Sequence, residues 1–274
     1  MRSADAVGPV PPGTGWTGDL ATWQTPVASS PADVVRLSGN APTLDHLTAR
    51  ISVCRACPRL VEWREHVAVE KRAAFRAEPY WGRPVTGWGP ARARIAVVGL
   101  APAAHGGNRT GRIFTGDRSG DWLFAALHRS GLARQPTSVS ADDGQQLLDV
   151  RMLAAVRCAP PANKPTPEER DACRPWMEEE LRFLRPSLRV VVALGGFAWG
   201  ALWPVLETVG YPVPARPPRF GHLRECLLDD DLLVLASYHP SQQNTFTGKL
   251  TEQMLDDVFG RARAHAEGSD SDRV

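Results

Sequence analysis

Long hydrophobic runs are absent from this chain of 274 residues. No apolar stretch approaches the roughly 18 residues that a membrane-spanning helix needs, and the N-terminus lacks the charged and then apolar pattern of a signal peptide. We therefore expect a cytoplasmic protein that does not contact a membrane. A strong surplus of charge is absent too, because 32 basic and 30 acidic residues leave a formal net charge of +2. Net charge alone therefore does not identify a nucleic-acid partner.

Apolar periodicity is missing at both ends of the chain. Residues 1–40 contain five prolines and five glycines without a repeating hydrophobic pattern, so they offer little surface whose burial would offset the entropy of ordering. Residues 267–274 are polar. We expect a disordered leader over 1–40, a flexible tail over 267–274 and one domain over 41–266.

Within the domain, short apolar runs alternate with helical patterns. The runs predict four buried strands, at Arg94–Gly99, Val150–Arg157, Leu188–Leu194 and Leu232–Ser237. Helices are expected at Gly120–Ser130, from Pro167 onward, at Phe197–Val209 and at Thr251–His265. This alternation predicts an α/β protein, a three-layer α/β/α sandwich around a short, mostly parallel four-stranded sheet. Ligands of such sheets bind beyond the carboxyl ends of the strands.

Positive charge is concentrated in one segment. Residues 83–118 contain six arginines and a single acidic residue, Asp117. Such a segment suits a surface that faces phosphate groups, and a solvated face with scattered charges explains it equally well.

Cysteine is scarce, with five residues in the chain. In a reducing compartment, their spacing indicates metal or cluster ligation rather than disulfides. Cys54 and Cys57 form a C-x-x-C pair, Cys158 follows the second predicted strand, and Cys173 lies fifteen residues further on in the second predicted helix. Zinc ribbons usually repeat C-x-x-C after a short spacer, so this spacing favours an iron–sulfur cluster, with zinc and unligated buried cysteines as alternatives. Cys226 is expected to be a small core residue.

Two loops at the predicted ligand-binding edge carry polar side chains. Residues 99–117, after the first predicted strand, read GLAPAAHGGNRTGRIFTGD. This loop lacks the lysine of a Walker loop and the G-x-G-x-x-G of a dinucleotide site, which argues against a nucleotide cofactor. The last predicted strand leads into HPSQQN, residues 239–244. Lone histidines are more often structural, but His239 lies at a strand end opposite a carboxylate-bearing loop, which favours a catalytic role.

The loop GLAPAAHGGNRTGRIFTGD, the motif HPSQQN and four of the cysteines together resemble the family 5, or type B, uracil-DNA glycosylases, over roughly residues 52–265. The resemblance implies a repair enzyme that flips uracil, and other deaminated or modified bases, out of DNA and hydrolyses the glycosidic bond. It implies double-stranded and single-stranded DNA as partners, and we expect a monomer associated with the nucleoid. It also implies a structural 4Fe-4S cluster, held by Cys54, Cys57, Cys158 and Cys173.

The resemblance further implies roles for single residues. By matching position, Phe114 would stack on the flipped base, and His239 would lie against the pyrimidine carbonyl. Asp117 would be the polar catalytic group that stabilises the positively charged sugar and orients water. Asn244 would contact DNA beside the lesion, and the Ser241 hydroxyl would hold the DNA backbone.

Three positions bear on the choice of base. Leu100 and Ala101, expected at the substrate, are apolar where related families place an acid or asparagine that positions water. Such a pocket is expected to select uracil less strictly. Asn163, after the second predicted strand, either restores part of the lost polarity as a catalytic residue or only forms a turn between prolines.

Two functions of other classes stay open at this stage. A non-catalytic iron–sulfur protein for electron transfer or sensing would use the four cysteines and leave Asp117, Phe114 and HPSQQN without a role. A zinc-stabilised DNA-binding module without catalysis is the other alternative.

Overall fold

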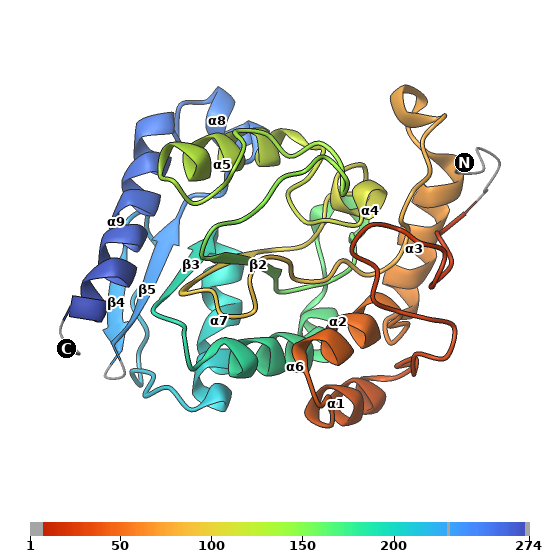
Figure 1. Cartoon of the computed structure of the whole chain (residues 1–274), viewed down its shortest axis with the longest axis horizontal. Helices are drawn as coiled ribbons and strands as arrows, with labels where there is room; N and C mark the ends of the chain where they lie inside the picture. The colour runs from red at the N-terminus through yellow and green to blue at the C-terminus, as the bar shows by residue number, and fades with distance from the viewer. Residues whose placement is uncertain (1–7, 229–230, 272–274) are drawn as a thin grey trace.

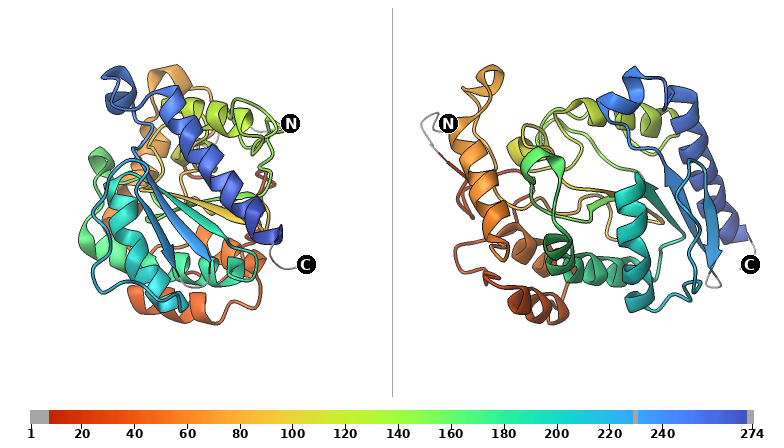
Figure 2. Two further views of the ribbon diagram at one scale, coloured as in Figure 1. Left: turned by 90° about the vertical axis from the view of Figure 1, so that its left-hand side faces the viewer. Right: turned by 180° about the vertical axis from the view of Figure 1, so that it is seen from behind.

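The computed structural model describes residues 8–228 and 231–271. A central sheet is covered by helices on both faces (Figures 1 and 2). The strands are β1 (Ile95–Gly99), β2 (Val150–Ala154), β3 (Val190–Leu194), β4 (Glu225–Leu228) and β5 (Leu232–Ser237). The helices are α1 (Pro31–Gly39), α2 (Leu44–Ser52), α3 (Pro58–Glu70), α4 (Gly107–Thr110), α5 (Arg118–Arg129), α6 (Pro167–Leu184), α7 (Gly196–Val209), α8 (Gln242–Phe246) and α9 (Glu252–Ser271), with short 3-10 helices η1 (Ala73–Phe75) and η2 (Pro161–Asn163). No helix within the described ranges is long and apolar enough to cross a membrane.

The sheet has the strand order β2-β1-β3-β5-β4, in which β4 alone runs antiparallel to its neighbour. The four expected strands are confirmed, and the expected count of four is wrong because β4 adds a fifth. Only Leu228 of β4 is buried, while Leu227 is 61% exposed. A short edge strand that is buried at one end carries too weak an alternating pattern to be recognised. Cys226, on this strand, packs half-buried against the apolar core.

Alternate residues of each strand face opposite helical layers. Val97 of β1 packs in one apolar cluster with side chains of α5 and α9, whereas Val98 packs in a second cluster with side chains of α6 and α7. The left view of Figure 2 shows α9 on one face of the sheet and α7 on the other. The expected α/β/α sandwich is therefore confirmed.

The predicted helices of the domain are confirmed as α5, α6, α7 and α9. The start of α6 has the capping box expected from the sequence: the Thr166 hydroxyl accepts a hydrogen bond from the Glu169 N–H, and the Glu169 carboxylate accepts one from the Thr166 N–H. Helix α6 positions Cys173 about two turns from this start.

Residues 8–40 differ from the disordered leader expected there. Ala28, Val34 and Leu37 are at most 3% exposed, and they pack in one apolar cluster with Cys173 and Trp176 of α6. Val34 and Leu37 have the three-residue spacing of a helix, but two positions are too few to form a recognisable pattern, and their partner surface is distant in the sequence. Composition alone therefore gave the wrong expectation. Residues 1–7 lie outside the described residues. At the other end, α9 extends to Ser271 through the start of the expected tail, and residues 272–274 lie outside the described residues.

Candidate active site

A cleft of about 1020 Å³ opens where several strands end. Asp117, from the loop after β1, lines it together with Asn163, which follows β2, and Ser241, which follows β5. In Figure 1, α5 and α8 lie close together at the top of the view, and α4 lies further to the right, near α3. Three of the residues expected at the site therefore share one cavity.

The Asp117 carboxylate lies in the wall of this cleft. It caps α5, because Oδ1 accepts a hydrogen bond of 3.0 Å from the Gly120 N–H. Its Oδ2 lies so close to Gly106 that a Cβ atom there would be 2.1 Å away, so only glycine leaves room for the carboxylate. Burial raises the pKa of the Asp117 carboxyl, while hydrogen bonds from the Gly120 and Ser119 N–H groups act in the opposite direction. A poorly solvated carboxylate interacts strongly with any cation that develops beside it.

Phe114 and His239 meet at the strand ends. The Phe114 ring packs on the end of β1, where a Cβ atom on Gly99 would lie 2.7 Å from the ring. The centroids of the Phe114 and His239 rings are 6.0 Å apart, with their planes tilted by 37°. Phe114 has a φ of 55°, a left-handed conformation that is unusual for an aromatic residue and typical of functional sites. Neither ring is among the residues that line the large cleft.

The environment of His239 fixes its protonation state. Burial lowers the pKa of His239 to about 4, so its imidazole is neutral near pH 7. The Asn244 side chain donates a hydrogen bond of 2.8 Å from Nδ2 to the His239 carbonyl. Asn244 therefore holds the backbone that carries the histidine.

Asn163 and Ser241 differ in how their surroundings constrain them. Ala162 and Asn163 both have positive φ, 51° and 56°, which costs free energy at non-glycine residues. Asn163 is exposed and lines the cleft. Ser241 precedes α8, but its hydroxyl makes no capping hydrogen bond.

Leu100 and Ala101 lie between the strand end and the cysteines. The Leu100 carbonyl accepts a hydrogen bond of 3.0 Å from the Val156 N–H. Ala101 packs against a small apolar cluster that contains Val156 and Cys158. Neither residue lines the large cleft.

Four of the six arginines in residues 83–118 pair with carboxylates of the same chain, an arrangement that neither the phosphate-facing nor the solvated reading of this segment anticipates. Arg83 pairs with Asp19 in the interior, at 2.7 Å. The other three make internal ion pairs as well: Arg94 with Asp149, Arg109 with Glu78, and Arg112 with Asp143. Arg118 is 53% exposed and lines the cleft. Sequence alone did not reveal that distant carboxylates neutralise this segment.

Sequence reasoning also missed residues that line the cleft. Arg72, Phe75 and Glu78 come from the segment around η1, which carries no motif. His105 lies in the glycine-rich loop, and a histidine in a loop that follows a strand end is the signal that would have found it.

The four cysteines expected to be ligands line one small cavity of about 20 Å³. They come from the N-terminal side of α3, from the segment after β2 and from α6. Nitrogen donors approach two of the sulfurs: Arg64 Nη1 lies 2.8 Å from the Cys158 Sγ, and the Arg157 N–H donates to the Cys173 Sγ at 3.3 Å. Four sulfur donors with hydrogen bonds to the sulfurs fit a cysteine-ligated cluster.

Burial opposes ionisation of these thiols. It raises the pKa of Cys57 to about 12 and raises the pKa values of Cys54 and Cys173 as well. Thiolates at this position therefore require a positively charged partner. Within residues 8–228 and 231–271, no three His, Cys, Asp or Glu side chains form a group that could hold a single metal ion.

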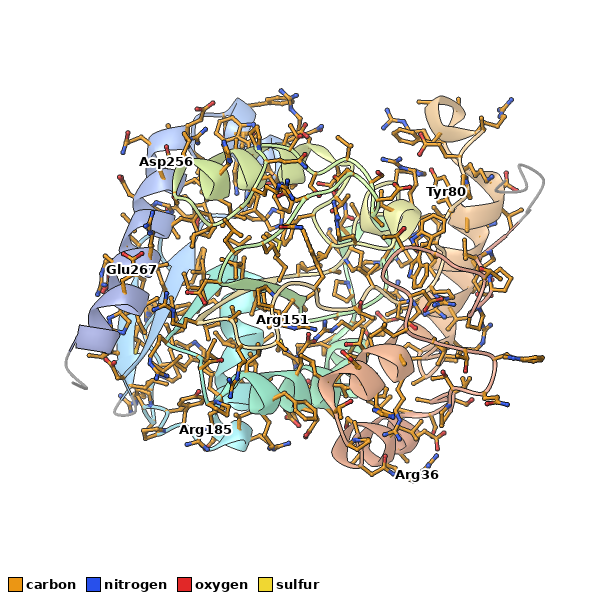
Figure 3. The ribbon with its side chains drawn as sticks, viewed as in Figure 1. Arg36, Tyr80, Arg151, Arg185, Asp256 and Glu267 are labelled. Atoms are coloured by element: carbon orange, nitrogen blue, oxygen red, sulfur yellow. The ribbon has the colours of Figure 1, made fainter. Side chains whose placement is uncertain are left out.

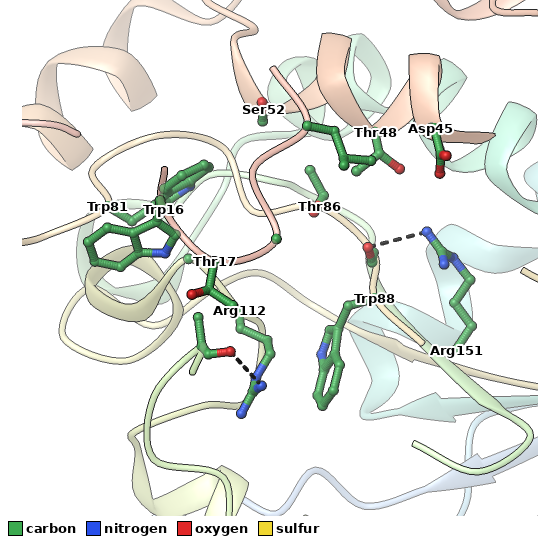
Figure 4. Close-up of a pocket in the computed structure, with 15 residues that line it drawn as sticks. Trp16, Thr17, Asp45, Thr48, Ser52, Trp81, Thr86, Trp88, Arg112 and Arg151 are labelled. Atoms are coloured by element: carbon green, nitrogen blue, oxygen red, sulfur yellow. Dashed lines mark hydrogen bonds between the residues drawn. The ribbon is translucent and has the colours of Figure 1, made fainter. Parts of the chain in front are cut away.

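A second cavity, of about 310 Å³, lies between the N-terminal segment, α2 and the loop before β1 (Figure 4). It contains none of the residues expected at the site. Its two arginines already have internal partners, because Arg112 bonds to the Ala141 carbonyl and to Asp143, and Arg151 bonds to the Gly87 carbonyl and to Glu180. The candidate catalytic residues therefore lie outside this second cavity, and Asp117 and Asn163 line the larger cleft.

Comparison with known proteins assigns this architecture to a class. A family model described as the uracil DNA glycosylase superfamily matches residues 86–263, which include both loops of the site. The chain therefore belongs to the uracil-DNA glycosylase superfamily.

Curated relatives identify the branch within this superfamily. The chain is 57% identical to a type-5 uracil-DNA glycosylase of Mycobacterium tuberculosis, over 93% of this chain and 94% of that protein. It is 53% identical to the type-5 protein of Thermus thermophilus, over 78% of this chain and 94% of that protein. For the type-5 protein of Pyrobaculum aerophilum, the identity is 47% over 85% of this chain and 98% of that protein. The resemblance to family 5 is therefore confirmed.

Proposed function

We propose that this chain is a DNA-repair glycosylase that takes uracil out of the DNA helix and hydrolyses its N-glycosidic bond. The observation that carries the proposal is the cleft in which Asp117, Asn163 and Ser241 meet beyond the ends of three strands. The names of the type-5 relatives support uracil as the base. They give no support to an electron carrier or a zinc module.

The chemistry of the bond defines what the site must supply. Breaking an N-glycosidic bond leaves positive charge on the sugar and negative charge on the departing base. The Asp117 carboxylate is suited to stabilise the sugar cation and to orient the attacking water. Burial lowers the pKa of His239 to about 4, so its imidazole is neutral near pH 7. The N–H group of the neutral ring donates a hydrogen bond to the carbonyl oxygen of the departing base.

The remaining residues bind and position the nucleotide. Phe114 offers the face of its ring to the flipped base, and stacking returns about 1–3 kcal/mol of the free energy spent on flipping. Ser241 holds a DNA phosphate through a hydroxyl that makes no capping hydrogen bond. Asn244 donates a hydrogen bond to the backbone carbonyl of His239 and so supports this residue. Asn244 also contacts DNA beside the lesion. Asn163 supplies a polar side chain to the cleft from a strained turn.

The apolar character of Leu100 and Ala101 favours a broad choice of bases. A site that buries a matched donor and acceptor rejects other bases strongly, because a wrong base leaves those groups unpaired. Without such a donor and acceptor, the site accepts hypoxanthine and modified pyrimidines in addition to uracil.

We further propose that Cys54, Cys57, Cys158 and Cys173 hold a 4Fe-4S cluster. The shared cavity and the hydrogen bonds from Arg64 and Arg157 support this assignment. When bound, the cluster supplies a covalent tie between chain segments. The catalytic steps above use protein side chains and water.

The proposed substrate indicates which partners and location to expect. We propose that the protein acts as a monomer on uracil in double-stranded and single-stranded DNA. A repair activity on chromosomal DNA corresponds to a cytoplasmic, nucleoid-associated location.

Duplexes that each contain one lesion test the proposal directly. Incubation with the purified protein, followed by alkaline cleavage at abasic sites, should cut the strand at uracil and leave undamaged duplex intact. Asp117→Asn protein is the matched control. Absence of cleavage at every lesion by a folded protein that contains its cluster would refute the proposed function. Purified protein should be brown, whereas a zinc site would leave it colourless.

A further inference from the structure

His105 lines the same cleft as Asp117 and comes from the same loop. Its Nδ1 atom lies 3.0 Å from the hydroxyl oxygen of Tyr80, and the two rings meet edge to face with centroids 6.1 Å apart. Tyr80 is 0% exposed and lies between α3 and α4 (Figure 3). A rigid, buried phenol therefore orients the imidazole in the cleft wall.

We assign the Tyr80 hydroxyl as the donor to His105 Nδ1. This hydroxyl also accepts a long hydrogen bond, 3.5 Å, from the Arg72 backbone N–H, so donation to Nδ1 would use it both as a donor and as an acceptor. Burial raises the pKa of Tyr80, which keeps the phenol protonated. Burial lowers the pKa of His105, and the guanidinium groups of Arg72 and Arg109 lower it further, so the ring is neutral near pH 7. A neutral ring that accepts at Nδ1 carries its proton on Nε2.

Arg109 holds His105 beside the Asp117 carboxylate. Its Nε donates to the His105 carbonyl at 2.8 Å, and its Nη2 donates to the Gly116 carbonyl at 2.9 Å. Its Nη1 pairs with Glu78. A single guanidinium, whose side chain is 8% exposed, therefore ties His105 to the residue that precedes Asp117.

We propose that the Nε2–H group of His105 donates a hydrogen bond to a non-bridging phosphate oxygen of the DNA, next to the nucleotide on which Asp117 acts. This inference rests on the proposed glycosylase function. Nδ1 is occupied by Tyr80, and the ring is held at the cleft, so Nε2 is the atom available to a ligand. A neutral donor fixes the position of the backbone, whereas charged side chains of the cleft such as Arg118 supply affinity that depends on salt.

Binding to a duplex that contains a tetrahydrofuran abasic analogue tests the contact. His105→Ala should weaken binding about tenfold, the upper end for a neutral hydrogen bond. The slope of log K against log salt should stay unchanged, because a neutral donor releases no counterion. Tyr80→Phe should cause a smaller loss, since the imidazole can then place its proton on either nitrogen. His105→Gln, which keeps an N–H donor, should recover part of the affinity.

Methylphosphonate substitution identifies the phosphate. With the phosphates on the 5′ and 3′ sides replaced one at a time, one replacement should weaken wild-type binding about tenfold and leave His105→Ala unaffected. Exposed His46 lies on α2, far from α8 in Figure 1, and His46→Ala is the control expected to match wild type. Thermal melting checks that each variant is folded.

Three results would overturn the inference. The first is unchanged binding by folded His105→Ala protein. The second is a salt slope for His105→Ala that is smaller than that of wild type by about one, which indicates a charged contact. The third is an equal loss of affinity for wild type and His105→Ala on every methylphosphonate duplex. The proposed function fails separately, if wild-type protein neither releases uracil nor binds the abasic duplex. When wild type does both and His105→Ala behaves identically, only the phosphate contact is wrong.

Discussion

Asp117 serves both the fold and the proposed chemistry, because the same carboxylate caps α5 and lines the cleft. An N-cap needs only a hydrogen-bond acceptor, and asparagine fills that role as well as aspartate. Stabilisation of a sugar cation requires the negative charge. Asp117→Asn therefore separates the two roles.

We expect Asp117→Asn to lower the single-turnover rate of uracil release about 100-fold or more, equivalent to about 2.7 kcal/mol in the barrier. Binding to abasic duplex should be nearly unchanged. If excision stays close to normal, the carboxylate is only a helix cap, and His239 takes the leading catalytic role.

The same substitution should not destabilise the fold at pH 7. Burial raises the pKa of Asp117 above its ordinary value of 3.8, so the folded state binds this proton more tightly than the unfolded state. Stability from this group therefore falls as pH rises from 3.8 through the raised pKa. A neutral asparagine side chain at this position would avoid that loss. Chemical denaturation should therefore give Asp117→Asn a free energy of unfolding equal to or above that of wild type.

His239 leads to a prediction about the pH profile. Its pKa of about 4 keeps it neutral from about pH 5 upward, whereas Asp117 must lose a proton to become active. The single-turnover rate should therefore rise with pH as Asp117 ionises. His239→Gln, which keeps a neutral N–H donor, should lower the rate and leave the apparent pKa of the acidic limb in place. A shift of that limb in His239→Gln would assign it to the histidine.

At the scale of secondary-structure elements, α1 ties the N-terminal segment to α6. Leu37 is 3% exposed and packs in the same apolar cluster as Cys173 and Trp176 of α6. Replacement of a buried leucine by alanine removes apolar contacts and leaves a cavity.

Leu37→Ala should therefore lower the free energy of unfolding by about 3 kcal/mol, as measured by urea denaturation. Val35→Ala is the matched control on the same helix, because Val35 is 61% exposed, and it should change stability by less than about 0.5 kcal/mol. Equal effects of the two substitutions would show that α1 does not stabilise the domain through this contact.

Elements could be predicted from the sequence where their burial is continuous. Strands β1, β3 and β5 are buried at every position, which produces unbroken apolar runs. Edge strand β4 could not be predicted because most of its residues are at least partly exposed. Helix α1 could not be predicted because the residues that stabilise it are far away in the sequence. Tertiary contacts of this kind leave no local pattern.

The candidate site follows the same rule. Residues in the loops that follow strands, such as Asp117 and Ser241, could be assigned to one edge of the sheet, and both line the cleft. Arg72 and Phe75 reach the cleft from a segment without a motif, and only the fold reveals them. The internal ion pairs of the arginines likewise depend on carboxylates from distant segments, such as Asp19 and Asp143.

At the scale of the whole molecule, the cysteine cavity joins the N-terminal helices to the sandwich. Two cysteines precede α3, whereas Cys158 follows β2 and Cys173 lies on α6. Arg59 of α3 also makes a bidentate ion pair with Glu169 of α6, at 2.7 and 2.6 Å. A cluster on the four sulfurs would therefore add a covalent tie to contacts that already exist.

Removal of the cluster should loosen this joint without unfolding the sandwich. Cys57→Ser, or treatment with an oxidant and an iron chelator, should bleach the protein, lower its melting temperature and direct limited proteolysis to residues 8–70, because the apolar contacts of α1 with α6 persist while the covalent tie is lost. Cys226→Ser is the control, since its thiol packs at the edge strand away from the cavity, and it should keep both colour and melting temperature. If Cys226→Ser bleaches the protein while Cys173→Ser does not, the ligand assignment is wrong.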